Sequence, residues 1–351
     1  MIRPRMLAAA CLSLFCLAGA APAERSMRIY FIDVLGGAAT LIVTPENESI
    51  LIDSGWPGQD DRDPKRIEHV LRKVAGLDHL DHLVTTHWHV DHFGGVEGLA
   101  GLVRIDHFWD RGLPDLSKAD ADRSAFPDGP DAKSAIGAAY RRLSEGKRKT
   151  LQAGDRLPLK GGVEARVLAS GGKVVGTRDG ETNPMCADAP SDLPVDPSDN
   201  ARSLAIRFRY KDFDFLDCGD LTWNVEKRLV CPVDRIGPID LYQVTHHGMS
   251  NSNHPTLVQT IVPTVAIMNN GPRKGGDPKT VQLLRSIPSI QAAYQLHKNA
   301  ATSAADNTDP ELIVNTEVTG GQFLRVSVTP DGARFIVRVG AEGQPRAFES
   351  K

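Results

Sequence analysis

Five of the eleven histidines in this chain lie between His79 and His92. Within that stretch, THWHVDHFGG places His87 and His89 two residues apart, so on an extended segment both imidazoles project from one side and can hold one cation. Asp91 and His92 follow where the chain turns toward a neighbouring position. Imidazole with carboxylate suits zinc, manganese or iron, and the absence of a thiolate here argues against a closed structural zinc site. The cluster predicts an open metal centre.

The flanking residues predict the elements that position this cluster. HLVTT reads as a short buried strand, HWHVDHFGG as a polar loop and VEGLAGLV as a helix, so the cluster sits at a strand-to-helix turn. Upstream, MRIYFIDV, ATLIVT and SILIDSG read as antiparallel strands, and the segment from Asp63 to Ala75 has helical spacing of apolar residues.

Strand patterns resume after residue 160, at VEARVLA, SLAIRFRY, FDFLDCGD, IDLYQVTHHG, TVAIMNNG and FLRVSVTPDGARFIVRVG. Two β-rich halves that each carry helices predict an α/β fold with two sheets packed face to face and helices outside. We expect one domain over residues 24–351, with insertions near residues 111–149 and 177–200. Each insertion reads equally well as a lid over the site or as a surface connection.

The motif and its surroundings resemble the metallo-β-lactamase superfamily. THWHVDHFGG resembles that superfamily's H-x-H-x-D-H signature, and LIDSG places Asp53 where it has a structural aspartate. NARSLAIRFRYKDFDFLDCGDLTW resembles the strand pair that delivers a bridging aspartate, here Asp220. YQVTHHGMSNS resembles a segment of ComEC-type hydrolase domains and of phosphorylcholine esterases. The resemblance implies an αββα sandwich of two mixed β-sheets with helices on the outer faces.

The resemblance also implies a ligand set for two divalent cations, with zinc expected first and manganese as the alternative. His87 and His89 would hold the first cation, Asp91 and His92 the second, and Asp220 would bridge them. The second site would be completed by one of two adjacent histidines, His246 or His247, of which we prefer His247 because it directly precedes a glycine.

One position departs from the superfamily pattern. Many members supply a further histidine to the first metal from the segment before the bridging aspartate, whereas this chain has Asn200 there, as ComEC-type relatives do. The first metal would then be weakly held or completed by water. We place Asn200 among the candidate substrate-binding residues, with Arg273 and Lys274 of NNGPRKGG and with His297. Alternatively, Arg273 and Lys274 lie in a solvated turn, and His297 has a structural role.

Two bound cations would lower the pKa of a water between them from 15.7 toward ~7, which makes a metal-bound hydroxide available as the nucleophile. Asp91 or Asp220 would orient that water, so both are candidate catalytic residues. Gly-x-Ser-x-Gly is absent from the sequence. Cys218 lacks an obvious base partner and reads as a packing or disulfide residue.

The N-terminus predicts export. MIRPR is basic, the apolar run MLAAACLSLFCLAGA is too short for a permanent transmembrane helix, and Ala21 and Ala23 give the small-x-small pattern cleaved before Glu24. Residues 1–23 are therefore predicted to be a signal peptide, which leaves a periplasmic or secreted chain without a membrane span. Its three cysteines, Cys186, Cys218 and Cys231, predict one disulfide and one free thiol, with the pairing open.

The net charge of the chain indicates which binding partners are favoured. Without residues 1–23 the chain has 39 basic and 44 acidic residues, and no basic stripe suggests a stable nucleic-acid partner. The leading hypothesis is hydrolysis of phosphodiester or phosphoester bonds in a small or medium-sized anionic substrate. Three alternatives stay open: a lactone or β-lactam hydrolase, a DNA-processing nuclease, and a non-catalytic binding protein that retains the fold.

Overall fold

The computed structural model describes residues 26–118, 125–131, 133–176 and 181–351. The predicted signal peptide, with its two cysteines, lies outside the described residues, as do short parts of both predicted insertions. Across the described ranges, no helix combines the length and the apolar character that a membrane crossing requires.

The first β-sheet is mixed. Its strands pair antiparallel from β18 to β3 and parallel from β3 to β6. Their spatial order is β18 (Arg346–Glu349), β17 (Arg334–Val339), β16 (Leu324–Val328), β1 (Arg28–Phe31), β2 (Thr40–Val43), β3 (Ser49–Ile52), β4 (His79–Thr85), β5 (Arg104–Asp110) and β6 (Arg148–Thr150).

The second sheet has the same division. Its strands pair parallel from β15 to β11 and antiparallel from β11 to β7, and β9 adds to β8. Their order is β15 (Ile313–Asn315), β14 (Ala292–His297), β13 (Val265–Met268), β12 (Leu241–Gln243), β11 (Phe213–Asp217), β10 (Ala205–Tyr210), β8 (Val163–Ser170) and β7 (Arg156–Leu157), with β9 at Lys173–Val174.

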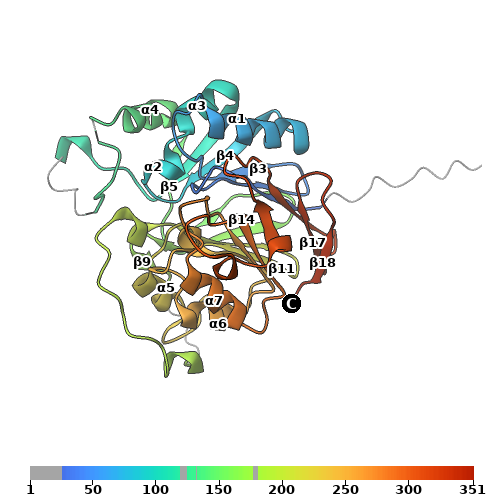
Figure 1. Cartoon of the computed structure of the whole chain (residues 1–351). Helices are drawn as coiled ribbons and strands as arrows, with labels where there is room; N and C mark the ends of the chain where they lie inside the picture. Colours follow the sequence, from blue (N-terminus) through green and yellow to red (C-terminus); the bar gives the residue numbers. More distant parts are fainter. Residues whose placement is uncertain (1–25, 119–124, 132, 177–180) are drawn as a thin grey trace, which may run out of the picture.

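Helices cover the outer faces of both sheets, so four layers are stacked (Figure 1). The first sheet carries α1 (Arg62–His69), which continues as a π-helical turn η1 (Val70–Val74), α3 (Val96–Leu102) and α4 (Ala135–Ser144); the second carries α5 (Trp223–Val230), α6 (Pro255–Ile261) and α7 (Pro278–Ser286). The short segments are α2 (Val90–Phe93), η2 (Leu116–Lys118), η3 (Pro184–Cys186), η4 (Asp199–Arg202), η5 (Thr245–Gly248), η6 (Ala304–Asp306) and η7 (Pro310–Leu312). The predicted αββα sandwich of two mixed sheets is confirmed.

The layers follow from which face of each strand is apolar. In β1, Ile29 and Phe31 enter the core between the two sheets, whereas Tyr30 points to the opposite face, under the helices. Phe31 meets Phe215 of β11 edge to face across the inter-sheet core, with ring centroids 5.8 Å apart. Because both faces are covered, the central strands are apolar almost without interruption.

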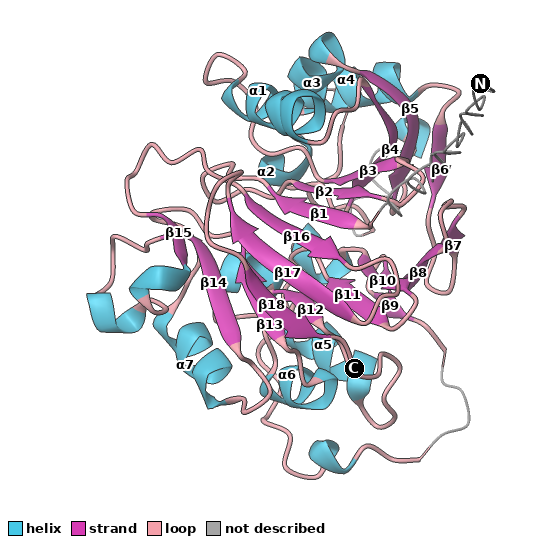
Figure 2. Cartoon of the chain, turned by 90° about the vertical axis from the view of Figure 1, so that its right-hand side faces the viewer, coloured by secondary structure: helices cyan, strands magenta, loops and turns pink. Residues whose placement is uncertain are grey.

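The two sheets are not formed by two successive halves of the chain, as the sequence had suggested. The predicted helix from Asp63 to Ala75 is present as α1 and η1, but the C-terminal hairpin β16–β17 and strand β18 return to the first sheet, beside β1 (Figure 2). The apolar alternation predicted this hairpin correctly. It could not predict the sheet, because strand pairing depends on neighbours distant in sequence.

Both predicted insertions are attached to the sandwich. The first supplies α4 and the edge strand β6. The second is joined to the end of α5 by a disulfide between Cys186 and Cys231, while Cys218 is a buried free thiol. One disulfide with one free cysteine confirms the predicted count and settles the pairing.

Helix α5 buries a carboxyl group beneath the second sheet. Glu226 is fully buried, and its Oε2 accepts a hydrogen bond from the backbone N–H of His254, at the start of α6, at 2.9 Å. Burial raises the pKa of Glu226 to about 8, even though backbone and side-chain donors act in the opposite direction. The folded protein therefore holds a proton that the unfolded chain releases near pH 4.5.

This proton makes stability depend on pH in a defined direction. Because the folded state binds more protons than the unfolded state, the free energy of unfolding should fall as the pH rises from about 4.5 to 8. Glu226→Gln does not lose stability in this way. Its free energy of unfolding should therefore be higher than that of the wild type by on the order of 1–3 kcal/mol at pH 8, and by much less at pH 5. Urea unfolding at both pH values measures the difference, and an equal gap at the two would contradict it.

Candidate metal centre

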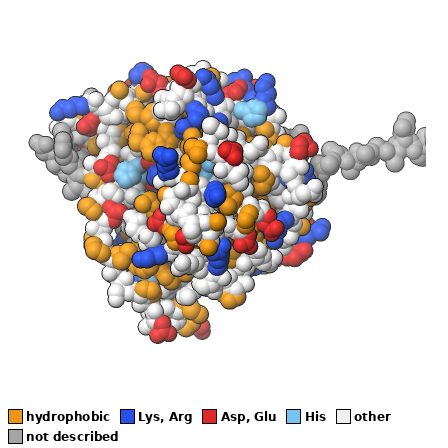
Figure 3. All heavy atoms as spheres, viewed as in Figure 1, with side chains coloured by type: hydrophobic (Ala, Val, Ile, Leu, Met, Phe, Trp, Pro, Cys, Tyr) orange, Lys and Arg blue, Asp and Glu red, His pale blue; other side chains and the backbone are white. Residues whose placement is uncertain are grey.

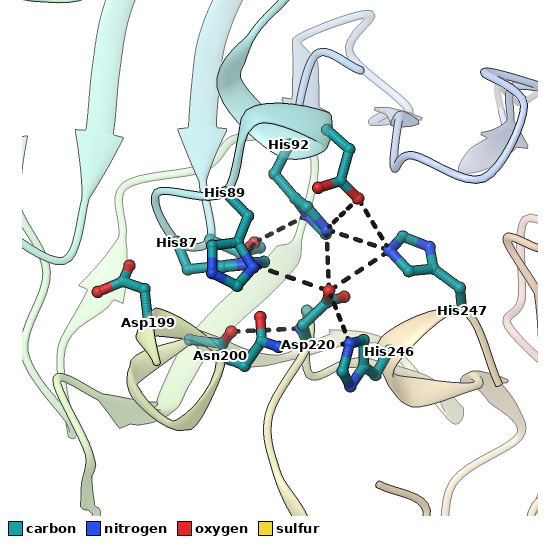
Figure 4. A network of polar contacts seen from close by, with 12 residues as sticks. His87, His89, His92, Asp199, Asn200, Asp220, His246 and His247 are labelled. Atoms are coloured by element: carbon teal, nitrogen blue, oxygen red, sulfur yellow. Dashed lines mark hydrogen bonds and ion pairs between the residues drawn. The ribbon is translucent and has the colours of Figure 1, made fainter. Parts of the chain in front are cut away.

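The predicted ligands meet where parallel strands of the two sheets end. His87 and His89 follow β4, and Asp91 and His92 lie on the single turn of α2. Asp220 follows β11, and His247 follows β12 in η5. The ends of parallel strands are where open α/β sheets place ligands, and here two sheets contribute together (Figure 4).

Four ligand atoms form one tight set, called here the second group: Asp91 Oδ2, His92 Nε2, Asp220 Oδ2 and His247 Nε2. Five of the six separations among these atoms are between 3.2 and 3.4 Å. The sixth is within 4.8 Å. A point inside such a tetrahedron lies about 2 Å from its corners, which is the length of zinc bonds to nitrogen and oxygen.

The first group consists of His87, His89 and Asp220, which offer ligand atoms within 4.8 Å of one another. His87 Nε2 lies 3.8 Å from Asp220 Oδ2 and has no hydrogen-bond partner, although the imidazole is fully buried. Asn200 lies beside this group (Figure 4), and its Nδ2 is 3.3 Å from His246 Nε2. The Asp220 carboxylate belongs to both groups, as a bridging aspartate would.

The other ring nitrogen of each histidine in the second group is held by an acceptor. His92 Nδ1 lies 2.7 Å from Asp53 Oδ2, and His247 Nδ1 lies 3.1 Å from the carbonyl oxygen of Asn269. Such partners fix the tautomer of metal-binding histidines, because the nitrogen that carries hydrogen faces the acceptor. A neutral His92 or His247 therefore presents a lone pair from Nε2 to the carboxylates.

The first group is held in the same way. Thr86 Oγ1 donates to Asp53 at 2.7 Å, so its lone pair can accept from His87 Nδ1 at 3.1 Å. His89 Nε2 lies 3.1 Å from Asp128 Oδ2, which leaves Nδ1 of that ring for a ligand bond. Nitrogen lone pairs and carboxylate oxygens thus converge at the two groups, and a donor reaches them from the border, where Lys274 Nζ contacts Asp91 Oδ2.

The electrostatics agree with a place for positive charge. Burial raises the pKa of Asp220, but His247, His92 and His246 outweigh this and hold the pKa of its carboxyl well below the usual value. Burial lowers the pKa of His92, yet Asp220 and Asp91 raise it well above its ordinary value. Protonated histidines or divalent cations would both satisfy these carboxylates. The unpartnered His87 nitrogen and the spacing of the second group fit cations.

The two adjacent histidines of η5 have an unusual backbone conformation, which points their side chains in different directions. His246 and His247 both have left-handed conformations, with φ of 55° and 53°. Asn253 supports this turn by donating from Nδ2 to the carbonyl oxygens of Thr245 and Met249 at 3.0 and 3.1 Å. The turn directs His247 to the second group and His246 toward Asn200.

A cationic loop borders the second group. Lys274 Nζ contacts Asp91 Oδ2 and lies 5.2 Å from the centroid of the Trp56 ring, and its side chain is 31% exposed. Gly275, with φ of 73°, packs so closely that a Cβ there would lie 2.1 Å from the carbonyl oxygen of His247. A side chain at residue 275 would therefore displace this loop or His247.

Figure 3 views the same face as Figure 1 and shows an exposed histidine and a basic side chain beside a gathering of apolar side chains. Among the residues next to the metal ligands, Val90 is an exposed apolar side chain. Arg273, predicted with Lys274, is exposed on the same loop. Beside the ligands, the surface thus combines the cation of Lys274 with the exposed apolar side chain of Val90.

The structure does not bring His297 to the two groups. Its imidazole is buried, with Nε2 2.7 Å from Asp33 Oδ1, and Arg66 contacts the other oxygen of Asp33 at 2.8 Å. The reason is its place in the sheet, because β14 is separated from β12, the strand before His247, by β13. His297 has a structural partner here, which was the alternative to its substrate-binding role.

The two insertions contribute residues near the site that the sequence did not indicate: Arg111 and Asp128 from the first, and Asp199 from the second. Arg111 and Asp199 form a buried ion pair, and Asp199 Oδ2 accepts from the backbone N–H of Trp88 at 2.7 Å. Asp128 Oδ2 accepts from the N–H of Asp199 at 3.0 Å while it contacts His89. No sequence signal marked Asp128, because it lies in a segment whose Asp, Pro and Ser content indicates only a loop.

The sequence was compared with known proteins. Residues 32–164 match the profile of the metallo-beta-lactamase superfamily. This segment includes the motif from His87 to His92 and ends before Asp220. Over residues 32–164 the chain matches a metallo-β-lactamase superfamily domain, and its two mixed sheets with helices on the outer faces agree with that fold. No curated protein matches the sequence significantly.

Solved structures with low similarity to this chain are also known. The diiron β-hydroxylase CmlA from Streptomyces venezuelae is 15% identical, covering 70% of this chain and 45% of its own, with a TM-score of 0.37. A HARLDQ-motif mutant of a Cronobacter sakazakii metallo-β-lactamase is 14% identical over 78% and 79%, at 0.34. Zinc-bound PqqB from Methylobacterium extorquens is 11% identical over 59% of each chain, at 0.32. This chain spans about half the length of the CmlA chains it matches.

The Asp128 contact generates a prediction about metal affinity. If Asp128 fixes the tautomer of His89, then Asp128→Ala should weaken zinc binding at the first group by about 10- to 100-fold, the usual effect of losing a partner behind a metal-binding histidine. Asp128→Asn keeps an acceptor oxygen and should retain most of the affinity. Zinc titration against a chromophoric chelator measures this.

Asp131→Ala is the matched control, because Asp131 lies in the same segment and accepts from the backbone N–H groups of Lys133 and Ser134 instead of contacting a metal ligand among the described residues. Equal losses in the Asp128→Ala and Asp131→Ala variants, or no loss in either, would rule out a specific role for Asp128.

Proposed function

We propose that this chain is an exported, metal-dependent hydrolase that cleaves phosphodiester or phosphoester bonds in small or medium-sized anionic substrates. The proposal includes two divalent cations, zinc first and manganese as the alternative. The first would be held by His87, His89 and Asp220, and the second by the second group. When bound, such cations lower the pKa of water and stabilise negative charge on a substrate oxygen.

The chain's own residues have distinct tasks in this proposal. Asp91 or Asp220 orients the attacking water through its carboxylate oxygens. Asp53 and the carbonyl of Asn269 keep the rings of the second group in one tautomer. These tasks use side chains that are already held in place before substrate binds, which reduces the reorganisation needed during the reaction.

The observation that carries the substrate class is the position of Lys274. Its ammonium contacts Asp91 Oδ2 and its side chain is 31% exposed, so a substrate that reaches the ligands meets a cation beside them. A phosphodiester carries a negative charge on its non-bridging oxygens before the reaction starts, and a neutral lactone carries none. An ammonium therefore favours the phosphodiester during binding as well as in the transition state.

Export is proposed from the N-terminal sequence and from the cysteines. A disulfide such as Cys186–Cys231 persists in an oxidising compartment, which agrees with a periplasmic or secreted chain. The intact mass of protein recovered from an export-competent host should correspond to residues 24–351, and a full-length mass would contradict cleavage.

Hydrolysis of bis(p-nitrophenyl) phosphate tests the activity. The metal-free mature chain should be inactive, reloading with zinc or manganese should restore turnover, and Asp91→Ala should abolish it. The matched control is Asp106→Ala, which should leave turnover unchanged. Asp106 lies near the first residue of β5, at the end of the strand away from the metal ligands. Absence of turnover with either metal, together with cleavage of a lactone or a β-lactam under the same conditions, would overturn the phosphodiesterase proposal.

The same assay tests the Lys274 argument. Lys274→Ala should lower kcat/KM for the phosphodiester by about 10- to 100-fold, because a hydrogen bond to a charged group is worth roughly 1.5–3 kcal/mol. Lys274→Arg keeps the charge and should recover part of the loss. An unchanged kcat/KM in Lys274→Ala would remove the reason for preferring an anionic substrate.

A further inference from the structure

Among the residues that the structure describes, three side chains form the first group, and a buried oxygen beside them lacks a hydrogen-bond partner. Asn200 is 7% exposed, and its Oδ1 accepts no hydrogen bond. A buried carbonyl oxygen without a partner costs about 1–3 kcal/mol, so native structures rarely retain one without a reason. His87 Nε2, on the same side of the cluster, is a second buried acceptor without a partner.

A chain of hydrogen bonds fixes which way the carboxamide of Asn200 points. The chain ends at the carbonyl oxygen of Leu221, which can only accept, so Ser252 Oγ donates to it at 2.8 Å. The Ser252 oxygen then accepts from His246 Nδ1 at 3.1 Å. A neutral His246 with hydrogen on Nδ1 has its lone pair on Nε2, which accepts from Asn200 Nδ2 at 3.3 Å.

This direction leaves the oxygen of Asn200 on the side away from His246. Figure 4 shows the carboxamide beneath the rings of His87 and His89, beside Asp220, with His246 on its other side. The unpartnered Oδ1, the unpartnered His87 nitrogen and the Asp220 carboxylate are therefore acceptors gathered at one place. A cation there would satisfy all three.

We propose that Asn200 Oδ1 is a ligand of the cation in the first group, so that two imidazoles, a carboxamide oxygen and the Asp220 carboxylate hold it. The inference rests on the proposed metal-dependent function and adds a ligand to its site. It also makes His246 a positioning residue, which acts on the cation through Asn200. The predicted choice of His247 as the ligand in the second group is compatible with this division.

The donor set has a consequence for metal choice. Imidazole suits zinc, whereas carboxylate and carbonyl oxygens suit manganese and magnesium. With a carboxamide oxygen in place of a third imidazole, the first group binds zinc less strongly, relative to manganese, than a three-histidine site would. Replacement of Asn200 by histidine should reverse that preference.

Metal titration of the full mature chain tests the assignment. Metal-free protein is titrated with Mn²⁺, with free Mn²⁺ followed by electron paramagnetic resonance, and separately with Zn²⁺ against a chelator. The wild type should bind two ions per chain. Asn200→Leu has a similar shape without the oxygen and should lose at least about tenfold in affinity for one ion. Asn200→Asp should keep both, and Asn200→His should raise zinc affinity relative to manganese.

A second pair of variants tests the positioning chain. Ser252→Ala removes the hydroxyl that sets the direction of the His246 ring, so the affinity for one Mn²⁺ should fall by a smaller factor than in Asn200→Leu. Ser252→Thr keeps the hydroxyl and should restore it. A structural role alone would not give rescue by threonine at equal thermal stability.

The outcomes separate this inference from the proposed function. Two Mn²⁺ ions bound by Asn200→Leu with wild-type affinity would overturn the ligand assignment and leave metal-dependent hydrolysis standing. A wild-type chain that binds neither metal would overturn both. If Asn200→Leu does not fold, the decision falls to Asn200→His and Ser252→Ala, and unchanged zinc-to-manganese preference in the first with unchanged affinity in the second overturns the inference.

Discussion

One carboxylate oxygen, Asp220 Oδ2, is surrounded by the Nε2 atoms of four imidazoles at 3.2 to 3.8 Å, those of His87, His92, His246 and His247. A single oxygen cannot serve four ring nitrogens as hydrogen-bond partners, and neutral rings held in these tautomers present lone pairs to it. Positive charge between the ring nitrogens and the carboxylate oxygen would remove this repulsion. Two cations that share the carboxylate would supply such charge.

The rest of the fold holds these side chains in place. Each sheet sends the end of a parallel strand to the same edge of the sandwich, and the apolar core between the sheets fixes the spacing of those ends. Behind the rings, Asp53, Asp128 and the carbonyl of Asn269 hold the nitrogens that do not face the cluster. The first insertion, near residues 111–149, is part of this support, because it contains Asp128.

The sequence predicted the layers and the motif because both depend on local patterns: apolar alternation in the strands, and four potential ligand residues within six positions. It favoured His247 over His246 only from the glycine that follows, since the directions of the two rings depend on two left-handed residues that no spacing reveals. His297 and Asp128 show the same limit in opposite directions. Their partners, Asp33 and His89, are far away in sequence, so only tertiary structure could remove the first from the site and add the second.

The most direct test of the account is the metal content of the mature Asp220→Asn variant after saturation with zinc and desalting, measured by mass spectrometry of the elements beside the wild type. Because asparagine keeps the shape and removes the shared charge, the account predicts that both ions are lost together, with fewer than one remaining per chain. Retention of two zinc ions by the variant would contradict a centre built around the Asp220 carboxylate.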